Sequence, residues 1–97
     1  MIIRIVKMTF RQEDIPAFLE LFEGSKEKIK AFEGCLHLEL LQDINNPACF
    51  FTYSRWKNEQ HLNQYRDSEL FNSVWSQTKA LFAAKPEAWS TTLNYEC

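Results

Sequence analysis

Two apolar runs around a polar turn stand out in the pattern of hydrophobic and polar positions. Residues 34–56 consist of a Leu-rich segment, an Ile-Asn-Asn-Pro-Ala turn and a Phe-rich segment, which is typical of two strands joined as a hairpin. If Asp43 lies opposite Cys49, the alternation of side chains divides the hairpin into two faces. One face then carries Leu36, Leu38, Leu40, Phe50, Thr52, Ser54 and Trp56, and the other carries Cys35, His37, Glu39, Leu41, Phe51, Tyr53 and Arg55.

Both of these faces carry large apolar side chains. Leu41, Phe51 and Tyr53 lie on the face opposite Trp56, whereas an antiparallel sheet with one wet side alternates more cleanly between apolar and polar residues. We therefore expect a cover on both sides of the sheet. The chain's own helices would cover the Trp56 face, and a second copy of the chain would cover the other, so the pattern predicts a homodimer.

The segments around the hairpin also have clear periodicity. Residues 2–10 read as a strand, and residues 12–32 place apolar side chains at helical spacing, with Gly34 placed to end that helix as its C′ glycine. Asn58 and Ser68 are suited to cap a short helix and a longer one. The chain is therefore expected to enter and leave the hairpin through helices.

The last part of the chain completes the order of elements. Pro86 stops the second helical region, and residues 88–95 are β-prone. The order β-α-β-β-α-β predicts an α+β, ferredoxin-like fold, with an antiparallel four-stranded sheet and helices on one face. No linker or internal repeat interrupts the pattern, so residues 1–97 are expected to form a single domain.

The composition narrows the class of partner. Hydrophobic residues make up 45% and aromatic residues 14% of the 97 residues, which favours a folded core with an interface or a pocket for a planar ligand. The net charge is −2 without a basic tract, so neither nucleic acid nor an anionic membrane is expected as a partner. No apolar run approaches the roughly 20 residues of a membrane span, and the N-terminal residues lack the features of a signal peptide.

The cysteines bear on the compartment of the protein. Cys35, Cys49 and Cys97 are an odd number without CxxC spacing. Free thiols in a reducing cytoplasm fit this pattern, and a metal site does not. We therefore expect a cytoplasmic protein that binds no metal.

One row of polar residues on the hairpin superficially resembles a catalytic set. Cys35, His37 and Glu39 alternate on one predicted strand face, but residues two apart on a strand are about 7 Å apart, which is too far for a direct thiol–imidazole hydrogen bond. We expect this row to be interface or surface, with His37 near Arg55 across the hairpin. His61, near a helix start, is expected to be solvated.

Several short motifs occur in order along the chain. They are Phe32-Glu-Gly-Cys, Gln42-Asp43 at a strand end, Phe50-Phe-Thr-Tyr-Ser-Arg-Trp56, His61-Leu62, Tyr65 and Ser68-Glu-Leu-Phe71. In order and spacing, over nearly the whole chain, they resemble the antibiotic biosynthesis monooxygenase (ABM) domain family of the dimeric α+β barrel superfamily. The resemblance implies a ferredoxin-like subunit that forms a homodimer.

The chain departs from the family's pattern at its polar positions. Ser54 stands where the family's Glu-x-Trp motif has Glu, Tyr65 replaces the His of the next helical motif, and Leu70 replaces a second His. Trp56 and Phe71 match the pattern. The resemblance is therefore stronger for the fold than for the reaction.

Relatives that degrade haem place an Asn on the first strand, a Trp on the second helical region and a haem-ligating His beyond it. At about these positions this chain offers Val6, Tyr65 and Trp75. No axial ligand is in place, so we do not expect haem degradation.

The resemblance implies a reaction that needs no metal or flavin in the domain itself. A phenol or quinol loses a proton, and the resulting anion reduces O₂ directly inside a closed apolar pocket. The residues proposed to line this pocket combine large apolar walls with a few polar tips, although a core uses the same residue types. They are Thr52, Ser54, Trp56, Tyr65 and Trp75.

Three functions therefore remain open. The chain could be a cofactor-independent monooxygenase acting on a small aromatic substrate, a non-catalytic ligand-binding or stress-associated dimer, or an isomerase or decarboxylase of small metabolites, since one fold hosts many functions. The chain lacks the family's Glu and His residues. The second function is therefore more strongly favoured than the resemblance alone would suggest. In each case we expect the protein to purify colourless, without metal, flavin or haem.

Overall fold

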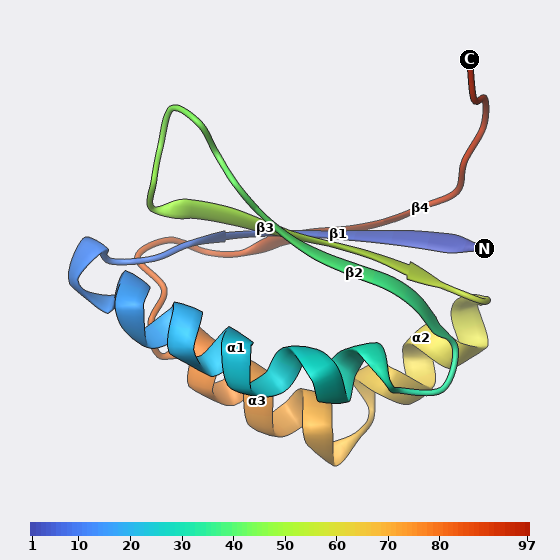
Figure 1. Cartoon of the computed structure of the whole chain (residues 1–97), viewed down its shortest axis with the longest axis horizontal. Helices are drawn as coiled ribbons and strands as arrows, with labels where there is room; N and C mark the ends of the chain where they lie inside the picture. The colour runs from blue at the N-terminus through green and yellow to red at the C-terminus, as the bar shows by residue number, and fades with distance from the viewer.

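The chain folds as two layers, a sheet and a set of helices that cover one of its faces (Figure 1). The computed structural model describes all residues, 1–97. The sheet has four antiparallel strands in the order β2-β3-β1-β4, which confirms the predicted ferredoxin-like fold. The strands are β1 (Ile2–Thr9), β2 (Cys35–Gln42), β3 (Cys49–Trp56) and β4 (Glu87–Thr91).

The helical layer follows the predicted segments, with one difference at the first helix and another at the end of the last, which stops at Lys79 and not at Pro86 as expected. Residues 12–32 form a short 3₁₀ helix, η1 (Gln12–Asp14), followed by α1 (Ile15–Lys30). The second region divides into α2 (Glu59–Arg66) and α3 (Glu69–Lys79). Both predicted N-caps are confirmed. The side chain of Asn58 accepts a hydrogen bond from the His61 amide at 2.9 Å, and that of Ser68 accepts one from the Phe71 amide at 3.1 Å.

Gly34 does not end α1 as expected. The C-cap of α1 is Ala31, and Gly34 lies in the turn just before β2 with a φ of 88°. Its carbonyl accepts a hydrogen bond from the Lys57 amide at 2.8 Å, which fastens it to the end of β3. The glycine is required by the turn into the sheet rather than by the end of the helix.

The predicted hairpin register is confirmed from His37, which pairs with Arg55, to Gln42, which pairs with Phe50. A β-bulge between Cys35 and His37 then shifts the pairing, so Cys35 lies opposite Trp56. The predicted row that joined Cys35 to His37 and Glu39 is therefore wrong. Leu36 was expected on the Trp56 face but is the extra residue of the bulge, and it is 50% exposed.

The core lies between the sheet and α1. Met8, Phe10, Phe18 and Phe50 form a buried cluster in which the rings of Phe10 and Phe18 stack with centroids 4.1 Å apart. Ser25 interrupts the apolar stripe of α1 but is buried, because its hydroxyl donates to the Leu21 carbonyl at 2.7 Å. Only 11 of the 97 residues are buried, so this core is small for the number of apolar residues in the chain.

The predicted final strand over residues 88–95 is wrong in its second half. β4 pairs only with β1, and its last pair is Ile3–Thr91, one residue from the start of β1 at Ile2. Residues 92–97 belong to no strand and leave the sheet on the side away from the helices (Figure 1). Leu93 and Tyr95 in this arm are 52% and 86% exposed.

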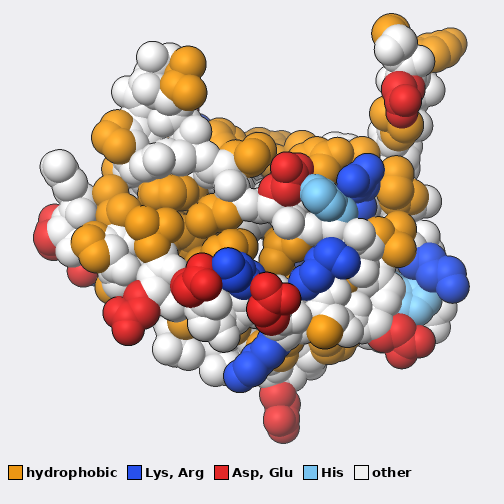
Figure 2. All heavy atoms as spheres, in the orientation of Figure 1, with side chains coloured by type: hydrophobic (Ala, Val, Ile, Leu, Met, Phe, Trp, Pro, Cys, Tyr) orange, Lys and Arg blue, Asp and Glu red, His pale blue; other side chains and the backbone are white.

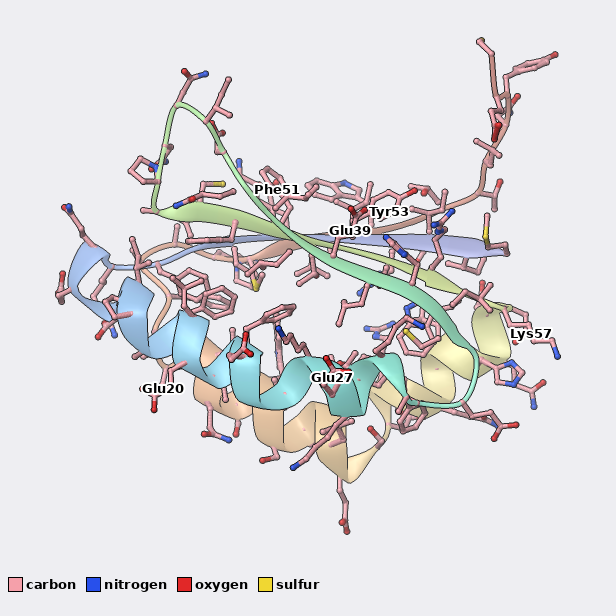
Figure 3. All side chains as sticks on the ribbon, viewed as in Figure 1. Glu20, Glu27, Glu39, Phe51, Tyr53 and Lys57 are labelled. Carbon is pink, nitrogen blue, oxygen red and sulfur yellow. The ribbon has the colours of Figure 1, made fainter.

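The second face of the sheet has no cover within the chain. Figure 3 shows Phe51, Tyr53 and Glu39 on the side of the sheet away from the helices. Leu41 and Trp89 on the same side are each 45% exposed, and Figure 2 shows hydrophobic side chains along this upper edge of the molecule. The apolar side chains on this open face are Ile3, Ile5, Leu41, Phe51, Tyr53 and Trp89. None of the helices is long and apolar enough to cross a membrane.

Candidate functional site

A cavity of about 330 Å³ lies between the sheet and the helices. Inward-facing residues of all four strands, most of them from β1 and β3, form its roof, and residues of α1, α2 and α3 form its walls. Thirteen of the 18 lining residues are hydrophobic. All five residues selected from the sequence lie on this one cavity: Thr52, Ser54, Trp56, Tyr65 and Trp75.

A continuous series of aromatic rings forms one wall of the cavity. Trp56 and Tyr65 stack with centroids 4.8 Å apart and an interplanar angle of 24°. Phe71 meets Tyr65 edge-on at 5.3 Å and stacks on Trp75 at 5.8 Å and 12°. The four rings therefore present flat faces and edges against which a planar ligand could pack.

Ser54 occupies the position where the family pattern has Glu, and its role here is structural. Its hydroxyl accepts a hydrogen bond from Nε1 of Trp56 at 3.0 Å, so it satisfies the polar atom of an indole that is 1% exposed. Both residues are fixed by β3, two positions apart on the same face. Ser54 therefore orients the Trp56 ring and supplies no base.

Tyr65 occupies the position of the family's His, but its electrostatics differ from those of an imidazole. Burial raises the pKa of Tyr65 far above its usual range, and the charge of ionised Cys35 raises it further. Cys35 contributes because the bulge turns it toward Trp56, and burial raises the pKa of the Cys35 thiol as well. At neutral pH Tyr65 is a protonated hydrogen-bond donor and not a base.

The histidines lie outside the cavity. His37 is on the open face, with its Nε2 3.1 Å from Oε1 of Glu39 and its backbone opposite Arg55, as expected. The expectation that His61 is solvated is wrong. Its side chain is 19% exposed, packs against Gly34 and places Nδ1 2.8 Å from Oδ1 of Asn58. Nowhere do three His, Cys, Asp or Glu side chains come together as a possible metal site.

Two arginines on the cavity were missed by the sequence analysis. Arg4 and Arg66 are the only charged residues among those that line it. Arg4 could have been found, because every second residue of a strand lies on the same face. Arg4 therefore shares a face with Ile2, Val6 and Met8, and this face points inward. Arg66 could not, because its direction depends on how the short helix α2 packs against the sheet.

Comparison with known proteins agrees with this architecture. The family model of the antibiotic biosynthesis monooxygenase matches residues 1–74. No curated protein matches the chain. A crystal structure described as antibiotic biosynthesis monooxygenase is similar to this chain with a TM-score of 0.90 and 20% identity, over 96% of this chain and 98% of that one.

Two further solved structures are similar in fold. A conserved protein from Methanosarcina mazei Go1 has a TM-score of 0.88 and 24% identity, over 94% of this chain and 91% of that one. A protein from Mycobacterium tuberculosis has a TM-score of 0.89 and 16% identity, over 98% and 96%. At these identities the likeness shows the fold alone, whereas the family match extends over most of the chain. The chain therefore belongs to the antibiotic biosynthesis monooxygenase family.

Proposed function

We propose that the cavity binds a small aromatic ligand of the phenol or quinol type, and that the protein oxidises it as a cofactor-independent monooxygenase. The observation that carries the proposal is the series of rings from Trp56 through Tyr65 and Phe71 to Trp75 along a largely apolar cavity. A planar ring can stack on such a wall, and apolar surroundings keep water from a reactive anion. Membership of a family named for monooxygenase activity supports the reaction class.

In this reaction the substrate itself supplies the electrons. The phenol loses its proton, and the carbon para to its oxygen joins O₂ by one-electron transfer and radical recombination. The resulting peroxide takes up a proton and loses water, which leaves a quinone. One atom of O₂ is then in the quinone and the other is in the water. The protein's part is to hold the ring against the aromatic wall, to donate a hydrogen bond from Tyr65 and to exclude solvent.

One feature of the cavity favours a second candidate, a non-catalytic ligand-binding protein. The titratable residues that line the cavity are Arg4, Tyr65 and Arg66, and none of these accepts a proton at neutral pH. Proton removal would therefore depend on the acidity of the substrate or on a bound water. A chain that binds a phenol without oxidising it would have this same lining.

Oxygen uptake separates the two candidates. A thermal-shift screen with quinols, naphthols and catechols identifies a ligand, and an oxygen electrode then measures turnover of that ligand. Oxidation by the parent chain supports the monooxygenase. Binding without oxidation, together with oxidation by Tyr65→His, supports a binding relative of the oxygenases. Tyr95→His is the matched control, since Tyr95 is 86% exposed and lies outside the cavity. A screen in which no aromatic compound binds contradicts both candidates.

We also propose that the protein is a homodimer joined through the open sheet face. The face combines half-exposed Leu41 and Trp89 with partly buried Phe51 and Tyr53. These residues lie together on one face of the sheet, whereas the exposed apolar residues of an ordinary surface are scattered singly. Nε of Arg55, on the same face, is buried without a hydrogen-bond partner, and a second copy could supply one. The arm of residues 92–97 rises on this side, where a second subunit would lie (Figure 1).

A further inference from the structure

The lining of the cavity includes two positively charged residues, Arg4, which is partly buried, and Arg66, which is exposed, and no negatively charged one. Arg4 on β1 and Arg66 in the last turn of α2 both line it, and no Asp or Glu does. Neither guanidinium belongs to any of the ion pairs in the structure, which join Arg11 to Asp14, Lys26 to Glu23, His37 to Glu39 and His61 to Glu33. The net charge of the chain is −2, so the positive cavity is a local feature and not a consequence of the overall charge.

Arg4 is held toward the cavity by its strand. It pairs with Ser90 of β4 and with Ser54 of β3, and its Nη1 donates a hydrogen bond to the Ser90 hydroxyl at 3.0 Å. That bond uses one of the five N–H groups of the guanidinium and leaves the others available to a ligand. The neutral serine orients Arg4 without neutralising it.

The surroundings of Arg4 are electrostatically unfavourable. Burial lowers the pKa of Arg4, and the positive charge of Arg66 lowers it further. A cation partly removed from water beside a second cation costs free energy that no carboxylate of this chain offsets. A bound anion would supply the ion-pair partner that both guanidinium groups lack and would relieve both effects.

We propose that the ligand of this cavity is an aromatic carboxylic acid, with its ring on the aromatic wall and its carboxylate bound by Arg4 and Arg66. The inference rests on the proposed function, since it adds an acidic group to the ligand of the same cavity. A guanidinium presents a planar fork of donors that matches a carboxylate, and charge-assisted hydrogen bonds of this kind are stronger than neutral ones. The aromatic wall selects the ring, and the arginines select the acid.

A pair of probes that differ only in the carboxylate tests the proposal. These probes are 2-naphthol and 6-hydroxy-2-naphthoic acid, and their affinities are measured by titration calorimetry at pH 7, where only the acid is ionised. We expect the acid to bind about tenfold more tightly or better, which is the scale of hydrogen bonds to charged groups. This advantage should shrink as the salt concentration rises.

Variants assign the advantage to the two arginines. Arg4→Gln and Arg66→Gln should each reduce the preference for the acid, and the double variant should abolish it, while the affinity for 2-naphthol changes by less than about twofold. Retained naphthol binding also shows that a variant is folded with its cavity intact. Lys57→Gln is the charge-matched control, because Lys57 is exposed at the end of β3 and lies outside the cavity (Figure 3).

The outcomes distinguish this inference from the function on which it rests. Equal affinities for the two probes, or a preference that survives in the double variant, would overturn the carboxylate site and leave the aromatic cavity standing. The absorption band of the ionised form would show whether 2-naphthol binds as its phenolate. Such binding would mean that the arginines bind the phenol oxygen, and it would also overturn the carboxylate site. Binding of neither probe would contradict the proposed function and the carboxylate site together.

Discussion

The Cα of Gly34 lies against the side chain of His61, so closely that a Cβ on Gly34 would overlap the Cβ, Cγ and Cδ2 atoms of the histidine. This contact joins the start of β2 to the first turn of α2. Gly34 also has a φ of 88°, a conformation that L side chains rarely adopt. Sterics and backbone conformation therefore both require glycine at this position.

A residue with a Cβ in the left-handed backbone conformation costs about 1–2 kcal/mol. Gly34→Ala should destabilise the fold by more than this, because the new methyl group also displaces His61. Urea unfolding followed by circular dichroism measures the change in the free energy of unfolding. Gly24→Ala is the control, since Gly24 lies inside α1 and a methyl group added there would meet nothing within 4 Å, and that variant should gain up to about 1 kcal/mol. Equal effects of the two variants would contradict the contact with His61.

Trp56→Ala should destabilise the protein by about 3–5 kcal/mol, because it removes an indole that is 1% exposed and leaves a void. It should also weaken the binding of any aromatic ligand, since Tyr65 loses the ring on which it stacks. Trp56→Phe keeps a ring and should cost less. The same unfolding and titration measurements apply, and an unfolding free energy unchanged in Trp56→Ala would show that the ring is not buried.

Tyr65→Phe should weaken the binding of a phenolic ligand by about 1 kcal/mol, the scale of one hydrogen bond, and should leave the protein folded. The reason is that Tyr65 is a protonated donor whose ring, and not its hydroxyl, makes the contacts with Trp56 and Phe71. Calorimetric titration of the parent chain and the variant with 2-naphthol measures the difference. Unchanged affinity would exclude Tyr65 as the donor.

Tyr65 also predicts how stability depends on alkaline pH. Its pKa is raised in the folded state, chiefly by burial, so folding favours the protonated phenol. The corresponding stability is fully present below the pKa of an exposed tyrosine, about 10, and is lost as the pH rises from there through the higher folded pKa. In urea unfolding above pH 10, Tyr65→Phe should lose less stability than the parent chain. A parallel decline in both proteins would contradict the burial of the phenol.

Phe51→Glu should convert the proposed dimer into monomers or insoluble protein, because it places an unpaired charge on the open sheet face. Sedimentation velocity at micromolar concentration measures the change. Ile44→Glu is the control, since Ile44 is 96% exposed in the hairpin turn and should not affect association. A parent chain that sediments as a monomer would contradict the dimer, and a Phe51→Glu variant that stays dimeric would place the interface elsewhere.

The features that sequence predicted well are those set by neighbouring residues. The helix caps at Asn58 and Ser68 depend on one side chain and an amide three residues away, and the register of the hairpin follows from strict alternation. The inward face of β3 brought Thr52, Ser54 and Trp56 to the cavity for the same reason. Their role in binding stays a prediction.

The features that sequence could not predict depend on distant partners. The bulge that turns Cys35 toward Trp56 leaves no mark on the alternation of polar and apolar residues. β4 ends at Thr91, which lies opposite Ile3 near the start of β1, although Leu93 and Tyr95 are as β-prone as the strand before them. The burial of His61 follows from its contact with Gly34, which is far away in sequence.

The cavity draws its lining from both ends of the chain, since Arg4 belongs to β1 and Ala88 to β4. A chain emerging from the ribosome can form α1 and the β2–β3 hairpin from neighbouring segments, but one edge of β1 stays unpaired until β4 has been made. During that time the exposed edge is open to pairing with other chains. A ligand that needs the complete cavity would bind only molecules in which β4 has paired with β1, and it would stabilise these against the unpaired, aggregation-prone forms that precede them.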